Sequence, residues 1–247
     1  MANSPVTMDS LPATIVEVRP LTQVSFSDFG TVIENPNPFL QPPVKMDRLP
    51  PYATEANQGT AIKYQDVTNM RDLYPMAPSK ASSRAVMNMF VCAPRELQRV
   101  SDEMLDGLFR IDILERHPFT TQTFIPLGLP PAVQKESWYL VVVAPSLPRS
   151  PADHLFPVPP GQLPPGRLSS QGLPDLTKIQ AFMAKGSQAV TYRAGTWHAP
   201  MVVIGTKSIE FVVVQFANGV AKEDCQEVVL RSQGQAGIQV AVPKVGP

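Results

Sequence analysis

The chain contains three histidines, and two of them lie in polar clusters at the ends of strand-like segments. The first cluster is Glu115–Pro118, which contains His117, and the second is Tyr192–Pro200, which contains His198. Imidazole can transfer protons near neutral pH or bind a divalent metal. The alternative is that both histidines are packed core residues and that Glu115 pairs with an arginine. We interpret the third, His154, as solvent-exposed and without a role.

Strand geometry predicts how these side chains point. Residues two apart on an extended strand share a face, so Glu115 and His117 should point the same way and Arg116 the opposite way. Pro118 favours an extended backbone at His117. Gly195 permits a tight corner before His198. We therefore expect the two clusters to meet in one pocket inside the protein.

Most of the chain that must position these residues reads as short strands separated by proline or glycine. The expected strands are Thr14–Arg19, Thr60–Val67, Ala85–Cys92, Phe109–His117, Thr121–Leu127, Trp138–Ala144, Ala189–Tyr192 and Ser208–Phe216. The runs Trp138–Ala144 and Ile209–Phe216 are almost continuously apolar, which is typical of strands buried on both faces.

Two helices are also expected. One follows Pro174, because a helix would place its apolar residues on one face, with Asp175 in its first turn and Gly186 at its end. Those apolar residues are Leu176, Ile179, Phe182 and Met183. A shorter helix follows Pro94. Many strands, few helices and no βαβ alternation predict an all-β, mainly antiparallel barrel or sandwich.

Proline is unusually frequent, with 28 residues gathered mainly in two stretches. The first is Pro36–Pro51. The second, Ala144–Pro174, forms an excursion at about residues 145–174 that is too proline-rich for a central strand or a long helix. Because the flanking segments look like parts of one sheet system, we expect a single domain over residues 1–247. The excursion should lie outside the barrel and tolerate shortening.

Composition excludes several classes of partner. The chain has 43% hydrophobic residues, enough for a core, and 21 basic against 21 acidic residues. A balanced charge argues against nucleic acid and anionic membranes as partners. We find no apolar run that could span a bilayer and no secretory signal. Cys92 and Cys225 are far apart and fit two free thiols, so we expect a cytoplasmic protein.

The spacing of the polar clusters resembles the two metal-binding motifs of cupin barrels. Glu115, His117 and Gln122 stand where the first motif has two histidines and a glutamate, and Gly195 with His198 matches the Gly-x-x-His of the second. Two imidazoles, a carboxylate and an amide oxygen can hold a divalent metal. The expected metal ligands are Glu115, His117, Gln122 and His198.

The order of longer motifs resembles the ureidoglycolate lyase family. The strongest likeness is Ile113–Pro118 continuing through Thr121–Leu127, followed by Tyr192 and Gly195–Pro200. Further matches are Pro20-Leu21, Phe26, Phe29-Gly30, Val32–Glu34, Asn57-Gln58-Gly59, Lys63-Tyr64, Pro174–Leu176 and Ala181-Phe182. The likeness covers about Glu17 to Val229. The excursion and the N-terminal arm are similar to insertions of fungal members. Bacterial members often have arginine at the position of Lys63, and lysine cannot form the bidentate pair that arginine makes with a carboxylate.

The resemblance implies a cupin-like β-barrel, usually a homodimer, associated with a divalent metal named as nickel. The implied reaction cleaves (S)-ureidoglycolate to glyoxylate and urea in allantoin and purine degradation. Ureidoglycolate carries a hydroxyl, a carboxylate and a urea nitrogen on one carbon. Its cleavage needs a base, an acid and a carboxylate anchor.

The candidate roles follow from that requirement. His198 or His117 would act as base or metal ligand, and Glu115 as the acid or a urea-binding group. Gln122 would bind the urea amide, Lys63 would anchor the carboxylate with Asn57 beside it, and Tyr192 would hydrogen-bond the substrate. We interpret Trp197 as a core residue.

Three alternatives remain open. An amidohydrolase would release ammonia from the same substrate. A metal-dependent cupin isomerase or oxygenase would normally retain a fuller set of histidines. A non-catalytic barrel would bind a small molecule without turnover.

Overall fold

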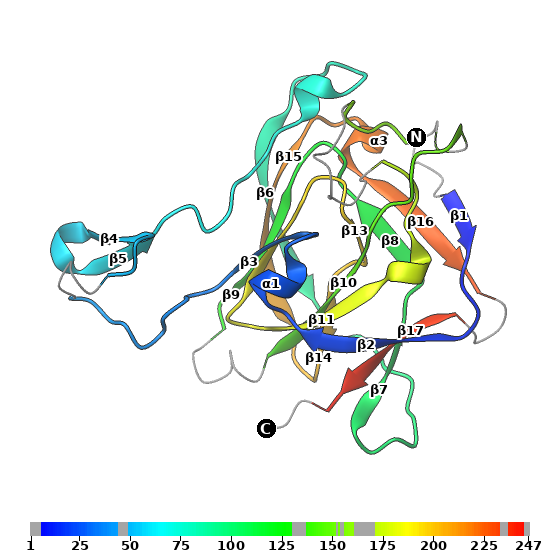
Figure 1. Ribbon diagram of the computed structural model, residues 1–247, viewed down its shortest axis with the longest axis horizontal. Coiled ribbons are helices and arrows are strands. Elements are labelled where there is room, and N and C mark those ends of the chain that lie inside the picture. The colour runs from blue at the N-terminus through cyan, green and yellow to red at the C-terminus, as the bar shows by residue number, and fades with distance from the viewer. Residues whose placement is uncertain are drawn as a thin grey trace.

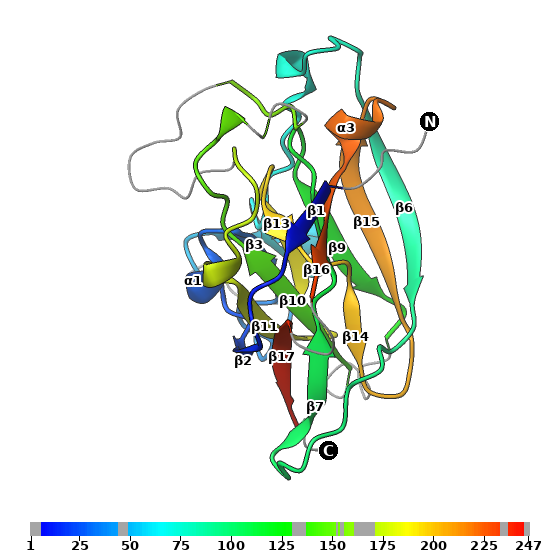
Figure 2. The same cartoon turned by 90° about the vertical axis from the view of Figure 1, so that its right-hand side faces the viewer.

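The computed structural model describes residues 6–43, 49–129, 137–151, 153, 156–160, 171–232 and 237–244. Its architecture is all-β: the strands form two curled sheets that face each other as a cupin-like barrel (Figures 1 and 2). The fold class expected from the sequence is therefore confirmed. Most strand pairs are antiparallel, while β2 lies parallel to both β11 and β17, and β1 lies parallel to β16.

The strands divide into a larger sheet, a smaller sheet and a separate hairpin. The larger sheet has the order β1 (Val6–Asp9), β16 (Gln226–Arg231), β8 (Ile113–Arg116), β13 (Trp197–His198), β10 (Trp138–Ala144), β11 (Gln180–Lys185), β2 (Thr14–Pro20), β17 (Ile238–Pro243) and β7 (Leu105–Arg110), and β14 (Val202–Ile204) also pairs with β10. The smaller sheet has the order β3 (Gly30–Ile33), β12 (Ala189–Tyr192), β9 (Gln122–Leu127), β15 (Ile209–Ala217) and β6 (Arg84–Cys92). The hairpin consists of β4 (Ala53–Ala56) and β5 (Ala61–Tyr64).

Helices are short. The α-helices are α1 (Gln23–Phe26) and α3 (Ala221–Asp224), and the 3-10 turns are η2 (Asn57–Gly59), η3 (Tyr74–Met76) and η5 (Leu176–Lys178). In the described part of the chain no helix is long and apolar enough to cross a membrane.

The core lies on both faces of β10. Leu140 and Val142 face one apolar cluster, which contains Trp197, and Tyr139 and Val141 face another, which contains Phe211. A strand covered on both sides needs apolar residues at every position, which explains the continuous run at Trp138–Ala144. The two clusters join the sheets and fix the strands that carry the polar site.

Both helix predictions were wrong. After Pro174 the chain makes only the 3-10 turn Leu176–Lys178, capped by Asp175, and then enters β11. This strand is central, lying between β10 and β2, so its residues are apolar on both faces and imitate a helical pattern. After Pro94 the described residues contain no helix and form isolated bridges instead. The expected strand Phe109–His117 also divides, because β7 pairs with β17 whereas β8 pairs with β16 and β13.

Parts of the proline-rich excursion belong to the core, contrary to the expectation that it lies outside the barrel. Phe156 and Val158 are buried, and Phe156 packs against Trp197 with ring centroids 6.1 Å apart. The carbonyl of Gly172 accepts hydrogen bonds from the Trp197 indole and from Arg116. His154 and residues 161–170 lie outside the described residues.

Candidate active site

The two polar clusters meet inside the barrel, as the sequence predicted. Antiparallel pairing of β8 with β13 sets Glu115 opposite His198. His198 Nε2 lies 3.5 Å from Glu115 Oε1, and the rings of His117 and His198 have centroids 5.8 Å apart. Both imidazoles are buried, so their nitrogens must be satisfied by neighbouring groups rather than by bulk water.

Backbone carbonyls select the tautomer of each histidine. His198 Nδ1 lies 2.9 Å from the carbonyl oxygen of Thr196, and His117 Nδ1 lies 2.6 Å from that of Asp224. A carbonyl can only accept a hydrogen bond, so each Nδ1 carries the proton and donates it. In the neutral form of each ring, Nε2 carries the lone pair. That of His117 accepts from Gln122, and that of His198 is left to accept a proton or bind a metal.

Gln122 connects the histidines to a second amide. Its Nε2 donates to His117 Nε2 at 2.9 Å and to Gln215 Oε1 at 2.7 Å. Gln122 Oε1 and His198 Nε2 are buried and have no hydrogen-bond partner among the described residues. Two buried acceptors without a partner, both on residues of this cluster, indicate that another group satisfies them when the protein works.

The donor set fits a divalent metal. Ligand atoms of Glu115, His117 and His198 all lie within 4.8 Å of one another. The Nδ1–H of each histidine is held by a carbonyl, which is the arrangement that orients imidazole ligands in metal sites. These are three of the four ligands expected from the sequence, and the fourth, Gln122, turns its amide nitrogen towards His117.

Charge at the site is set by burial and by the close pair. Burial raises the pKa of Glu115, but the interaction with His198, 3.5 Å away, and the charge of His117 outweigh burial and lower that pKa below its usual value. Burial, with the charge of His198, lowers the pKa of His117. At neutral pH the site therefore holds an ionised carboxylate beside an uncharged His117.

Aromatic residues hold His198 in place. The ring of Tyr192 stacks on the imidazole, with centroids 4.0 Å apart and planes 10° apart. Trp197 is fully buried and donates its indole N–H to the carbonyl of Gly172 at 3.0 Å, so its assignment to the core is confirmed. Tyr192, expected to contact the substrate, is buried and its ring lies against His198.

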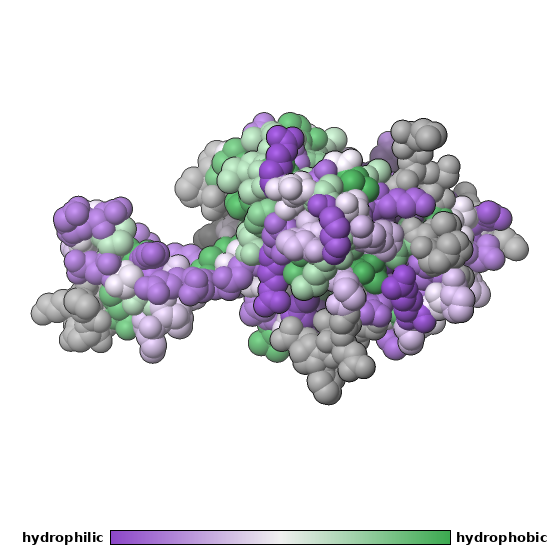
Figure 3. Space-filling model, turned by 90° about the horizontal axis from the view of Figure 1, so that it is seen from above, coloured by the Kyte–Doolittle hydropathy of each residue, from purple (hydrophilic) through white to green (hydrophobic). Residues whose placement is uncertain are grey.

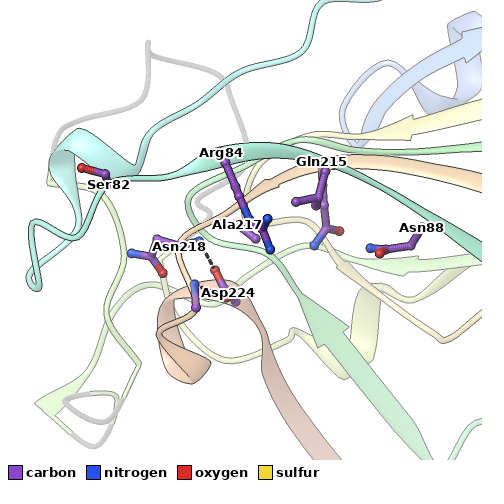
Figure 4. Close-up of a pocket in the computed structure, with 9 residues that line it drawn as sticks. Ser82, Arg84, Asn88, Gln215, Ala217, Asn218 and Asp224 are labelled. Carbon is purple, nitrogen blue, oxygen red and sulfur yellow. Dashed lines mark hydrogen bonds between the residues drawn. The ribbon is translucent and has the colours of Figure 1, made fainter.

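A polar pocket of about 450 Å³ opens beside this cluster (Figure 4). Two of its lining residues bond directly to the site: Gln215 accepts from Gln122, and the carbonyl of Asp224 accepts from His117. The lining residues are Ser82, Arg84, Val86, Asn88, Gln215, Ala217, Asn218, Gly219 and Asp224. The pocket gives a small polar substrate room next to the histidines.

Arg84 and Asn88 are functional candidates that the motifs did not reveal. They alternate with Val86 on the inward face of β6, opposite Ala217 and Val213 of β15. The side chain of Arg84 makes no hydrogen bond or ion pair with another residue in the described ranges, and Arg84 lines the pocket. Alternation of apolar and polar residues along β6 was the available signal. It is misleading here, because the apolar residues Met87 and Met89 point outward and the polar residues Arg84 and Asn88 point inward.

The structure does not bring Lys63 and Asn57 to the site of their own chain. Both are exposed, Lys63 on β5 and Asn57 in the turn between β4 and β5. Figure 1 shows that hairpin standing away from the barrel. Of the residues predicted for the site, the structure brings together Glu115, His117, Gln122, Tyr192 and His198.

Comparisons with known proteins cover the same strands. A family model described as ureidoglycolate lyase matches residues 13–236. The chain is similar to a ureidoglycolate lyase of Schizosaccharomyces pombe, with 36% identity over 85% of this chain and 89% of that protein. Similar relatives are the ureidoglycolate lyases of Saccharomyces cerevisiae, at 34% identity over 81% of this chain and 84% of that one, and of Burkholderia mallei, at 30% over 81% of each.

Proposed function

The chain belongs to the ureidoglycolate lyase family, and from this premise we propose that its buried histidine–carboxylate cluster cleaves (S)-ureidoglycolate to glyoxylate and urea. The observation that carries the assignment to this site is the unpartnered Nε2 of His198 beside Glu115. A lone pair held at a fixed place, next to an ionised carboxylate, is what a general base requires.

The proposed chemistry is a proton transfer coupled to bond cleavage. His198 Nε2 takes the proton of the substrate hydroxyl, and the C–O bond becomes the aldehyde C=O of glyoxylate. The C–N bond breaks, its electron pair goes to the urea nitrogen, and the same proton returns to that nitrogen. Glu115 stabilises the transient imidazolium by its charge. No water is consumed, which makes the reaction a lyase reaction.

The pocket residues bind the rest of the substrate in this proposal. Arg84 is the cation that can form a bidentate pair with the substrate carboxylate. Asn88 and Gln215 can hydrogen-bond the urea amide groups, and Gln122 orients Gln215 through its amide. Fixing the hydroxyl near His198 supplies the orientation that an intramolecular-like reaction needs.

A divalent metal, named as nickel by the family resemblance, would be held by Glu115 and His117, with Gln122 and His198 as further ligands. Because His198 Nε2 has a single lone pair, His198 would serve either as a ligand or as the base, and the proton transfer above is the role without a bound ion. Such an ion supplies a Lewis acid that makes a substrate hydroxyl more acidic. We further propose that the enzyme is one domain, acts in the cytoplasm, and is a homodimer. The free thiols of Cys92 and Cys225 support a reducing compartment.

The test is incubation of the purified protein with ureidoglycolate. Glyoxylate and urea should appear in equal amounts. Ammonia as the first product would show that the protein is an amidohydrolase instead of a lyase. Saturable binding without any product would show that it binds the molecule without catalysis.

A further inference from the structure

We propose that a second copy of this chain covers the outer face of the five-stranded sheet, and that each copy lends Lys63 to the active site of the other. The part that crosses is the hairpin arm, defined as residues 50–67. This inference rests on the proposed function for its substrate, but the surfaces that carry it are independent of the reaction.

The hairpin arm lacks support from its own barrel. β4 and β5 pair with each other and with no other strand in the described part of the chain. Figure 3 shows the arm as a lobe joined to the body by a narrow neck. A lone two-stranded hairpin is at best marginally stable in water, so a surface outside this copy must hold it.

An uncovered apolar surface lies on the outer face of the five-stranded sheet. Met87, Met89 and Val91 alternate along β6 and are 76%, 55% and 67% exposed. Ile125 and Leu127 of β9 continue the surface beyond β15. β6 is also the edge strand of its sheet. A contiguous apolar surface on an edge strand marks an interface, because exposure to water is costly and invites pairing.

The hairpin arm leaves the body from that same face. Thr68 Oγ1 donates to Thr191 Oγ1 at 2.9 Å, and Thr123 Oγ1 donates to Met70 Sδ at 3.1 Å. Thr123 and Thr191 point outward, since their neighbours Phe124 and Tyr192 point into the core. From Thr68 the chain can extend at most about 3.3 Å per residue, so the tip at Gly59 reaches roughly 30 Å. A partner seated on the outer face is within that reach.

In a two-fold symmetric dimer, the same surface of each copy can form the whole interface. An isologous dimer brings the same patch together from each side, so the apolar face covers itself and each arm extends over the other copy. The pocket opens beside β6, and its rim begins at Ser82 and Arg84. An arm that passes around this single edge strand therefore arrives at the partner's pocket.

The tip of the arm has the chemistry of a binding element. Asn57, Gln58 and Gly59 all have positive φ, at 50°, 53° and 86°. Glycine adopts a positive φ without cost, but Asn57 and Gln58 do not, and such strain is retained mainly where a site needs the geometry. Lys63 lies opposite Thr54 on the hairpin, is exposed, and makes no ion pair within the described ranges. Lys63 adds a second cation to the substrate carboxylate beside Arg84.

A mixed dimer separates the crossed arrangement from an uncrossed one. Lys63→Ala and His198→Ala chains are co-expressed with different tags, and the heterodimer is purified. If the arm crosses, one site of the heterodimer keeps both Lys63 and His198, and about half of the wild-type activity returns. If the arm serves its own chain, both sites are defective, and activity no higher than that of the two variant homodimers would overturn the proposal. Lys207→Ala, an exposed lysine at the opposite end of β15, should behave as wild type.

A second experiment needs no activity, so it separates failure of this inference from failure of the proposed function. In the double variant Gln58→Cys and Ser82→Cys, oxidation should give a covalent dimer, and each single variant should not. A disulfide within one chain, or a protein that sedimentation shows to be monomeric at micromolar concentration, would refute the crossing arm. Met87→Lys with Met89→Lys should convert the dimer to a monomer.

Discussion

The ring of Tyr192 lies flat on the imidazole of His198, 4.0 Å away, while the proton on His198 Nδ1 is held by the carbonyl of Thr196. Two contacts thus fix the plane and the tautomer of the proposed base. Tyr192→Phe keeps the stacked ring and should keep kcat, whereas Tyr192→Leu should lower kcat by about tenfold through misorientation. A raised KM in Tyr192→Phe would instead show that the hydroxyl binds substrate.

Removing the base tests the proposed proton transfer. His198→Ala should reduce kcat by about 10²–10⁴-fold, the usual contribution of a placed acid or base. His154→Ala is the matched control and should leave kcat unchanged. Steady-state kinetics, with folding checked by circular dichroism, measure both. A well-folded His198→Ala protein with near-normal kcat would show that His198 is a packed core residue without a catalytic role.

Arg84 should contribute mainly to binding. An anchor for the carboxylate acts on ground state and transition state alike, so Arg84→Ala should raise KM more than it lowers kcat. Arg84→Lys should recover part of the loss, because lysine keeps the charge but not the bidentate geometry. Arg99→Ala, an exposed arginine that does not line the pocket, is the control. An unchanged KM in Arg84→Ala would remove this residue from the site.

Metal binding can be measured without turnover. Titration of chelator-treated protein with Ni²⁺ should give one site per chain, and His117→Ala and Glu115→Gln should each weaken it by at least about tenfold. Cys225→Ser provides a control, since Cys225 belongs to a different group of potential ligands around Glu115. Equal binding by all variants would place the ion elsewhere.

The proline-rich excursion should tolerate deletion only in its middle part. Deleting residues 161–170 should leave the free energy of unfolding nearly unchanged. Phe156→Ala should lower it by about 3–5 kcal/mol, because the ring packs in the core against Trp197. Urea unfolding measures both changes. A stable protein after removal of all residues from 150 to 170 would contradict the role of Phe156.

Much of this architecture could be predicted from local pattern. The strands at Ala85–Cys92, Trp138–Ala144 and Ala189–Tyr192 were found because β-branched runs between breakers are local signals. Strands β13 and β14 were not predicted because they are two or three residues long and form only through pairing with β10 and, for β13, also with β8. Strand β11 was mistaken for a helix for a tertiary reason, namely its burial between two neighbours.

Some residues of the site could also be predicted from the sequence, and others could not. Glu115, His117 and His198 could be predicted because rare polar types stand out at strand ends. Arg84 could not, because an exposed arginine on a strand is common and only the pairing of β6 with β15 turns it towards the pocket. Lys63 was expected to anchor the substrate carboxylate, but it lies exposed on the hairpin arm, and no local spacing in the sequence indicates whether a second copy brings it to a site.

The main chain, rather than side chains, holds the Nδ1 proton of both imidazoles, at Thr196 and at Asp224. A carbonyl is present whatever amino acid occupies the position. Substitution at Thr196 that keeps the local backbone should therefore leave the tautomer of His198 unchanged. The tautomer thus places no constraint on which amino acid occupies position 196. Selection on the orientation of His198 should act instead on the loop geometry, and thus on Gly195, whose φ of 81° few other residues adopt readily.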